Sequence, residues 1–207
     1  MSGVNDSLVV FLHGVGATGA DLARLAEPLS AFLPAAAFVA PDAPARFDGG
    51  GPGRQWFSVA GVSAANRAER VAEARQAFDR IVSNAVAERG FAGRLDRVAL
   101  FGFSQGSIMA LDALASGRWP VAAVVASSGR LPGAAVPLAA AAATPVLLLH
   151  GEADATIPAA ESRNAAARLR AAGFTVEARF FPQLGHSISV QGVEAAGVFL
   201  AAALRPA

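Results

Sequence analysis

The sequence has 207 residues, a length that fits one domain. Hydrophobic residues make up 54% and charged residues only 16%, which excludes intrinsic disorder, because a disordered chain has too little apolar material to form a core. The formal net charge of +1 excludes bulk electrostatic attraction to nucleic acid as the main function. The absence of cysteine excludes disulfides, thiol catalysis and cysteine-ligated zinc.

The apolar segments are too short to span a membrane. Leu8–Leu12 is shorter than a signal-peptide core, and no basic residue precedes it. The longest apolar stretch, Ala134–Leu149, is interrupted by Pro137 and Pro145. We therefore expect a soluble, cytoplasmic protein that makes no stable insertion into a membrane and binds no nucleic acid.

Short apolar runs alternate with longer amphipathic segments along the chain. The apolar runs predict strands over Leu8–His13, Ala36–Ala40, Arg97–Phe103, Val121–Ser127, Val146–His150 and Phe174–Phe181. Apolar residues at helical spacing predict helices over Ala20–Leu33, Ala64–Arg89, Ser107–Ser116, Ala159–Ala172 and Val190–Leu204. Two longer connections, Pro41–Val62 and Gly129–Thr144, interrupt this pattern. The alternation predicts a three-layer α/β fold, formed as a single domain over residues 1–207, with a mainly parallel sheet of about six strands.

Functional residues of such folds follow the carboxyl ends of the strands. The third predicted strand runs into the segment Gly102–Gly106, which has the pattern G-x-S-x-G. At a strand-to-helix junction this pattern is typical of a nucleophilic serine on a sharp turn, here Ser104. The alternative interpretation is an ordinary glycine-flanked turn, but the position of the pattern at a strand-to-helix junction favours the nucleophile.

A serine nucleophile needs a histidine base and a carboxylate that orients the histidine. Of the three histidines, His13 and His150 lie at the ends of predicted strands, and we interpret them as structural residues that shape the turns after those strands. His186 follows the last predicted strand and is the candidate base. Asp154, after the fifth strand, is the candidate carboxylate. The order Ser104, Asp154, His186 is that of the α/β-hydrolase arrangement.

Other carboxylates compete with Asp154. Glu152 is its local rival, and Asp42, after the second strand, is the remote one. Asp112 lies in the middle of a predicted helix and Asp96 precedes a strand, so neither is well placed for a catalytic role.

Acyl transfer also requires backbone donors for the oxyanion. We expect these from the N–H groups of Gln105, beside the serine, and of Val15, in the glycine-rich turn Gly14–Gly19. A phosphate-binding loop is the alternative for that turn. The turn lacks the lysine of a P-loop and does not match the dinucleotide pattern G-x-G-x-x-G.

Together these motifs resemble the phospholipase/carboxylesterase family, which includes acyl-protein thioesterases and small bacterial carboxylesterases. The resemblance rests on Phe11–Gly16, Gly102–Gly106, Ser128–Pro132, His150–Asp154 and Gly185–Ile188, and so spans nearly the whole chain. It implies a serine esterase that uses no metal or organic cofactor, with Ser104, Asp154 and His186 as the triad. The short segment before the first strand predicts that the extra N-terminal strands of fuller α/β-hydrolases are missing.

The predicted function is hydrolysis of small carboxylic esters or thioesters with short to medium acyl chains, without a separate cap domain. Trp56, Phe57 and Leu131 are the candidate substrate-binding residues, although Trp56 fits equally well as a residue that packs its loop onto the core. Two other functions stay open: dienelactone hydrolase-like chemistry, whose nucleophile is typically a cysteine that this chain lacks, and a non-catalytic binding protein that kept the fold. Formation of a homodimer is also left open.

Overall fold

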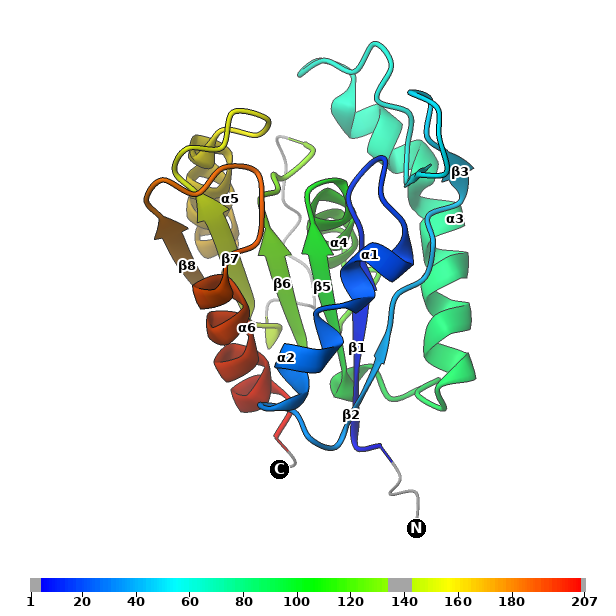
Figure 1. Cartoon of the computed structure of the whole chain (residues 1–207), viewed down its shortest axis with the longest axis vertical. Helices are drawn as coiled ribbons and strands as arrows, with labels where there is room; N and C mark the ends of the chain where they lie inside the picture. The colour runs from blue at the N-terminus through cyan, green and yellow to red at the C-terminus, as the bar shows by residue number, and fades with distance from the viewer. Residues whose placement is uncertain (1–4, 134–142, 206–207) are drawn as a thin grey trace.

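A parallel sheet of six strands forms the centre of the computed structural model, which describes residues 5–133 and 143–205 (Figure 1). Its strands are β1 (Ser7–Leu12), β2 (Ala36–Val39), β5 (Val98–Phe103), β6 (Ala123–Ser127), β7 (Val146–Gly151) and β8 (Val176–Phe181). They lie in the order β2-β1-β5-β6-β7-β8. The expectation of a mainly parallel sheet of about six strands is confirmed.

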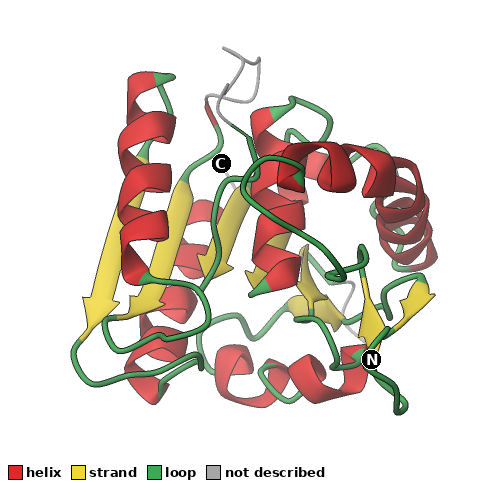
Figure 2. Cartoon of the chain, turned by 90° about the horizontal axis from the view of Figure 1, so that it is seen from above, coloured by secondary structure: helices red, strands yellow, loops and turns green. Residues whose placement is uncertain are grey.

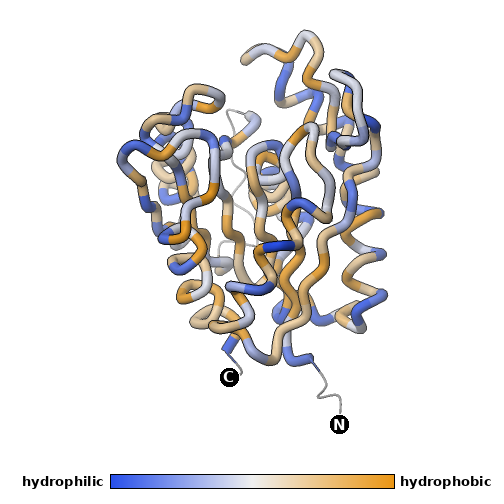
Figure 3. Tube along the Cα trace, viewed as in Figure 1, coloured by the Kyte–Doolittle hydropathy of each residue, from blue (hydrophilic) through white to orange (hydrophobic). Residues whose placement is uncertain are grey.

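Helices cover both faces of this sheet (Figure 2). The helices are α1 (Gly19–Ala23), α2 (Ala26–Ser30), α3 (Arg67–Glu88), α4 (Gln105–Ala115), α5 (Ala159–Ala171) and α6 (Val190–Ala203), with a 3₁₀ turn at Leu95–Arg97. Apolar side chains of α3, α4 and α5 form one core, and those of α1, α2 and α6 form a second core on the opposite face. The central strands are apolar along their length because both of their faces are covered (Figure 3). Three layers result, as predicted.

The predicted helix Ala20–Leu33 is instead two short helices, α1 and α2. A continuous α-helix would need the backbone N–H of residue 28 to bond to the carbonyl of residue 24. Residue 28 is proline, which has no N–H and whose ring would clash with the carbonyl of residue 24. Helix α1 therefore ends at Ala23, and a new helix begins at Ala26 with Pro28 in its first turn.

The connection expected to be irregular between residues 41 and 62 contains a small antiparallel hairpin. Its strands are β3 (Ala45–Arg46) and β4 (Arg54–Gln55), and Phe47 N–H donates to the Gly53 carbonyl at 2.9 Å. The glycine run 49–53 forms the turn of this hairpin, with positive φ at Gly50 and Gly51. The glycines therefore give this turn a backbone that other residues adopt at a cost.

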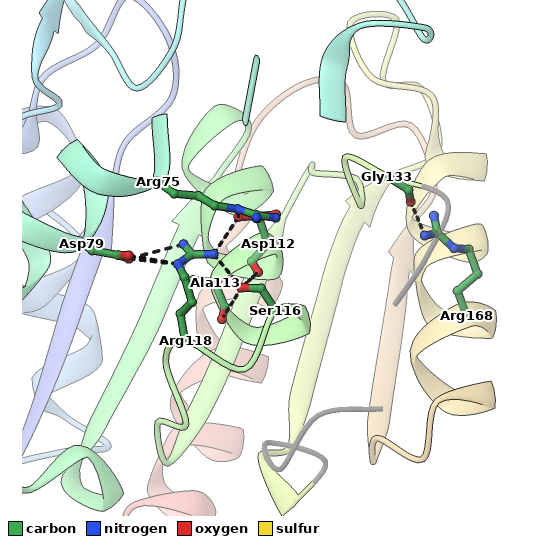
Figure 4. A network of polar contacts seen from close by, with 8 residues as sticks. All are labelled: Arg75, Asp79, Asp112, Ala113, Ser116, Arg118, Gly133 and Arg168. Atoms are coloured by element: carbon green, nitrogen blue, oxygen red, sulfur yellow. Dashed lines mark hydrogen bonds and ion pairs between the residues drawn. The ribbon is translucent and has the colours of Figure 1, made fainter. Parts of the chain in front are cut away.

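Helix α4, which follows the candidate nucleophile, is tied to α3 by an ion-pair network (Figure 4). The buried carboxylate of Asp112 pairs with Arg75 at 2.8 Å and with Arg118 at 3.0 Å. Arg118 also pairs with Asp79 on α3 at 2.9 Å. Asp112 thus holds two helices together, in agreement with its exclusion from the catalytic candidates.

Part of the predicted pocket wall lies outside the described residues. Of the connection Gly129–Thr144, residues 134–142 belong to this part, as do the chain ends 1–4 and 206–207. Within residues 5–133 and 143–205, no helix has the length and apolar character needed to cross a membrane.

Candidate active site

Ser104 occupies a strained turn between β5 and α4. Its φ of 53° and ψ of −115° lie outside the regions that residues with a side chain normally adopt. The turn is closed by its backbone N–H, which donates to the Ser127 carbonyl at 2.9 Å. A Cβ on Gly106 would lie only 1.9 Å from the Leu12 carbonyl oxygen, so glycine is required there for helix α4 to approach β1. The predicted sharp turn is therefore present.

His186 lies in the connection from β8 to α6, with its ring between the serine and Asp154. Its Nε2 is 2.9 Å from Ser104 Oγ, and its Nδ1 is 2.7 Å from Asp154 Oδ2. Because the carboxylate can only accept, Nδ1 carries the proton. Nε2 is then the acceptor for the serine hydroxyl. The structure brings together all three residues predicted for the triad.

Asp154 is buried, with 6% of its surface exposed, and is held by backbone amides. Its Oδ1 accepts hydrogen bonds from the N–H groups of Thr156 and Ile157, both at 2.9 Å. Burial raises the pKa of this carboxyl, but the hydrogen bonds from His186, Ile157 and Thr156 together outweigh it and hold the pKa below its usual value. Asp154 is therefore ionised at neutral pH.

This lowered pKa predicts a pH-dependent contribution to stability. A group with a lower pKa in the folded state stabilises the protein above its unfolded pKa, about 4 for aspartate, and that contribution is lost as pH falls through the folded pKa. Urea unfolding of the wild type and of Asp154→Asn should show this. As pH falls below about 4, the unfolding free energy of the wild type should decrease relative to that of the variant. A difference that stays constant down to pH 2.5 would contradict the assignment.

The competing carboxylates lie elsewhere. Glu152 is exposed and pairs with Arg163 on α5. Asp42 accepts a hydrogen bond from Gly19 N–H at 2.7 Å, at the start of α1. Neither carboxylate is bonded to His186, so the geometry favours Asp154 over both.

His13 fixes the peptide that precedes the predicted oxyanion donor Val15. The ring Nε2 accepts from Ala43 N–H at 3.0 Å, so Nδ1 carries the proton and donates to the Gly14 carbonyl at 2.7 Å. Burial lowers the pKa of His13, which keeps the ring neutral in this role. The carbonyl and the following N–H of a trans peptide point in opposite directions, so Val15 N–H points away from the His13 ring. His13 is structural, as the sequence suggested, and it sets the orientation of this peptide.

His150 contacts the carboxylate itself, a role that sequence reasoning missed. Its Nε2 lies 2.8 Å from the Ile157 carbonyl and 3.2 Å from Asp154 Oδ2, so this nitrogen carries the proton. Its Nδ1 is 2.6 Å from Ser162 Oγ, which donates to it. The signal for this contact was the four-residue spacing from His150 to Asp154 across one tight turn.

The Gln105 side chain is a second contact that the sequence did not reveal. Its Oε1 accepts from Trp56 N–H and its Nε2 donates to the Phe57 carbonyl, both at 2.7 Å. The residue after the candidate nucleophile therefore anchors the connection that contains the hairpin.

Of the two roles open for Trp56, its contacts favour packing. The side chain is 2% exposed, lies in the core beside α3, and is 5.4 Å from the Phe78 ring. Its Nε1–H donates to the His13 carbonyl at 2.9 Å. Phe57 and Leu131 are also largely buried in the same core.

We accordingly expect Trp56→Ala to destabilise the protein strongly. Removing a buried tryptophan costs about 3 kcal/mol or more, because a large cavity is left behind. Trp56→Phe, which keeps most of the ring but loses the bond to the His13 carbonyl, should cost less. Thermal unfolding checks the ranking, and a chain-length profile of ester hydrolysis checks the alternative. A changed profile with an unchanged melting temperature would make Trp56 a pocket residue.

Comparisons with known proteins show which family the chain resembles. Residues 3–204 match the model of the family described as Phospholipase/Carboxylesterase. The chain is 32% identical to Escherichia coli esterase YpfH over 187 residues, which cover 90% of this chain and 78% of YpfH. It is also 32% identical over 198 residues to a rice protein (Oryza sativa subsp. japonica) named as a probable inactive carboxylesterase, with 87% of this chain and 78% of that protein covered.

Among solved structures, that of esterase PE8 superposes with a TM-score of 0.82 at 31% identity. The match covers 96% of this chain and 93% of PE8. The family match extends over nearly the whole chain and includes every strand of the sheet. The chain belongs to the phospholipase/carboxylesterase family and is a carboxylesterase-type hydrolase of the α/β-hydrolase fold.

Proposed function

We propose that this hydrolase cleaves carboxylic esters or thioesters of short to medium acyl chains through an acyl-serine intermediate on Ser104. The observation that carries the proposal is the continuous hydrogen-bonded chain from Ser104 Oγ through His186 to Asp154. Each member comes from a different strand end, so the contact depends on the whole fold and is not a feature of one turn.

Acylation begins with the serine hydroxyl. His186 Nε2 takes the proton as Ser104 Oγ attacks the ester carbonyl, and the ionised Asp154 stabilises the imidazolium that forms. The imidazolium then gives the proton to the leaving alcohol or thiol. Water hydrolyses the acyl-serine by the same steps in reverse, with His186 again as the base.

The oxyanion of the tetrahedral intermediate requires two donors near Ser104. Gln105 is the first residue of α4, and the first amides of a helix have no acceptor within that helix. The β1–α1 turn lies against the serine, since a Cβ on Gly14 would be 3.2 Å from Ser104 Cβ. With the Gly14 carbonyl held by His13, Val15 N–H is the second donor in the proposal.

The limit to short and medium acyl chains is supported by the burial of the apolar candidates. Phe57 and Leu131 expose only a small part of their surface, so little apolar wall is free for an acyl chain. Each methylene covered by protein should raise kcat/KM about fourfold, and the gain should end once the chain passes this wall. A series of p-nitrophenyl esters from acetate to dodecanoate tests the limit, and a gain that continues to the longest chain would contradict it.

A binding protein without catalytic activity is the second candidate, because one relative is named as probably inactive. A fluorophosphonate probe distinguishes the two, since it reacts only with an activated serine. We expect one label per chain, located on Ser104 by peptide mass spectrometry, together with turnover of p-nitrophenyl acetate. A folded protein that neither labels nor turns over would favour the binding protein.

A further inference from the structure

A groove of about 360 Å³ lies beside His186, on the face of the sheet covered by α1 and α6. One wall is the connection from β8 to α6, with His186, Ser187 and Ile188. The other is formed by Leu22 of α1 and by Leu25, which lies between α1 and α2, and Phe103 of β5 also lines the groove. Both walls are at the carboxyl ends of the strands, where the blue β1–α1 and orange β8–α6 connections run in Figure 1.

This groove is separate from the predicted acyl-binding residues. Trp56, Phe57 and Leu131 belong to the core on the α3, α4 and α5 face of the sheet. The apolar residues of the groove pack with the core on the opposite face. An ester bound at Ser104 can therefore have its two halves on opposite faces.

The chemistry of the reaction assigns the groove to one of those halves. The leaving oxygen or sulfur must come within hydrogen-bonding distance of His186 Nε2, the atom that returns the proton. The group attached to that atom therefore departs on the His186 side of the serine. The residues that continue from His186, Ser187 and Ile188, form a wall of the groove.

The charge in the groove restricts which leaving groups it can bind. Asp21 also lines it, and its exposed carboxylate is fixed by hydrogen bonds from the N–H and hydroxyl of Thr18, both at 2.8 Å. The remaining walls are largely apolar. An anionic leaving group would meet the Asp21 carboxylate, whereas a neutral or cationic one would not be repelled.

We propose that this groove binds the alcohol or thiol half of the substrate and selects apolar leaving groups that carry no negative charge. The inference rests on the proposed serine-esterase function and adds to it a specificity site formed by the segment from α1 to Leu25 and by the β8–α6 connection. Leu25 supplies apolar contact, and Asp21 discriminates by charge.

The charge selection is tested with three aryl acetates: phenyl acetate, 4-carboxyphenyl acetate and 4-(trimethylammonio)phenyl acetate. Each ester is compared between the wild type and Asp21→Asn, so that differences in the intrinsic reactivity of the three esters cancel. This variant keeps an oxygen acceptor for Thr18. At low ionic strength, the ratio of kcat/KM for the cationic to the anionic ester should fall about three- to tenfold in the variant. The difference should shrink in 0.5 M salt. An unchanged ratio at low salt would overturn the role of Asp21.

The apolar part is tested with two ester series and two matched variants. Leu25→Ala should flatten the rise of kcat/KM along n-alkyl acetates, from ethyl to hexyl, and leave the slope along p-nitrophenyl acyl esters intact. Leu131→Ala, the control on the other face, should do the reverse. Leu25 is only half-buried, so the variant should fold, and thermal unfolding checks this. If Leu25→Ala flattened the acyl series instead, the groove would hold the acyl chain and the proposal would be wrong.

Fluorophosphonate labelling of Ser104 distinguishes a failure of the groove assignment from a failure of the proposed function. Variants that label and hydrolyse phenyl acetate, but whose kcat/KM depends on the leaving group as in the wild type, would overturn the groove assignment alone. A wild-type protein that does not label would overturn the proposed function, and the assignment with it.

Discussion

Replacing Ser104 with alanine should abolish fluorophosphonate labelling and reduce kcat/KM for p-nitrophenyl acetate by about 10⁴-fold or more. The hydroxyl is the only group that His186 Nε2 contacts as a base in the described structure, and nucleophile and base act as one unit. The residual rate would come from the oxyanion donors and from binding alone. Measurement of initial rates on the purified variant, with labelling followed by mass spectrometry, gives both results.

The fold should survive this change. Alanine at position 104 has the same positive-φ strain as serine, and the backbone hydrogen bond to the Ser127 carbonyl does not involve the hydroxyl. Ser83→Ala, an exposed serine on α3, is the matched control and should label fully. Full activity of a folded Ser104→Ala protein would end the serine mechanism.

The fold could be predicted well where apolar runs alone determine the structure. Strands β5, β6 and β7 are buried on both faces, so each reads as an unbroken apolar run with clear ends. The break between α1 and α2 was harder to predict, because the apolar spacing of Leu22, Leu25 and Leu29 continues across it and Pro28, whose missing N–H causes the break, lies further along the chain. The β3–β4 hairpin has only two residues on each strand, too few for any alternation to be visible.

The contacts of the candidate site also fall into those that the sequence could predict and those that it could not. The hydrogen-bonded grouping of Ser104, His186 and Asp154 was predictable because each residue follows a different strand in the order that the fold requires. The contact of His150 with Asp154 was not predictable, because the four-residue spacing between them does not by itself show that the turn folds back on itself. The bonds from the Gln105 side chain to the backbone of Trp56 and Phe57 join segments about 48 residues apart, and no local pattern records them.

Replacing Asp154 with asparagine should lower kcat about 10⁴-fold, and the structure gives the reason. The backbone amides of Thr156 and Ile157 both donate to Oδ1, so the asparagine side chain must keep its oxygen there. Its NH₂ group then occupies the position of Oδ2 and faces His186 Nδ1, which can no longer donate. The proton moves to Nε2, and the ring cannot accept the proton of Ser104.

Glu152→Gln is the matched control, because it makes the same chemical change two residues away. That side chain is exposed and bonds to Arg163, so its loss should change kcat less than about twofold. Burst kinetics with p-nitrophenyl acetate, measured for both variants under identical conditions, would separate acylation from turnover. Since an imidazole with its proton on Nε2 cannot act as the base, Asp154→Asn should lose the acylation burst itself. A preserved burst in Asp154→Asn, or a greater loss in Glu152→Gln, would show that another group orients His186.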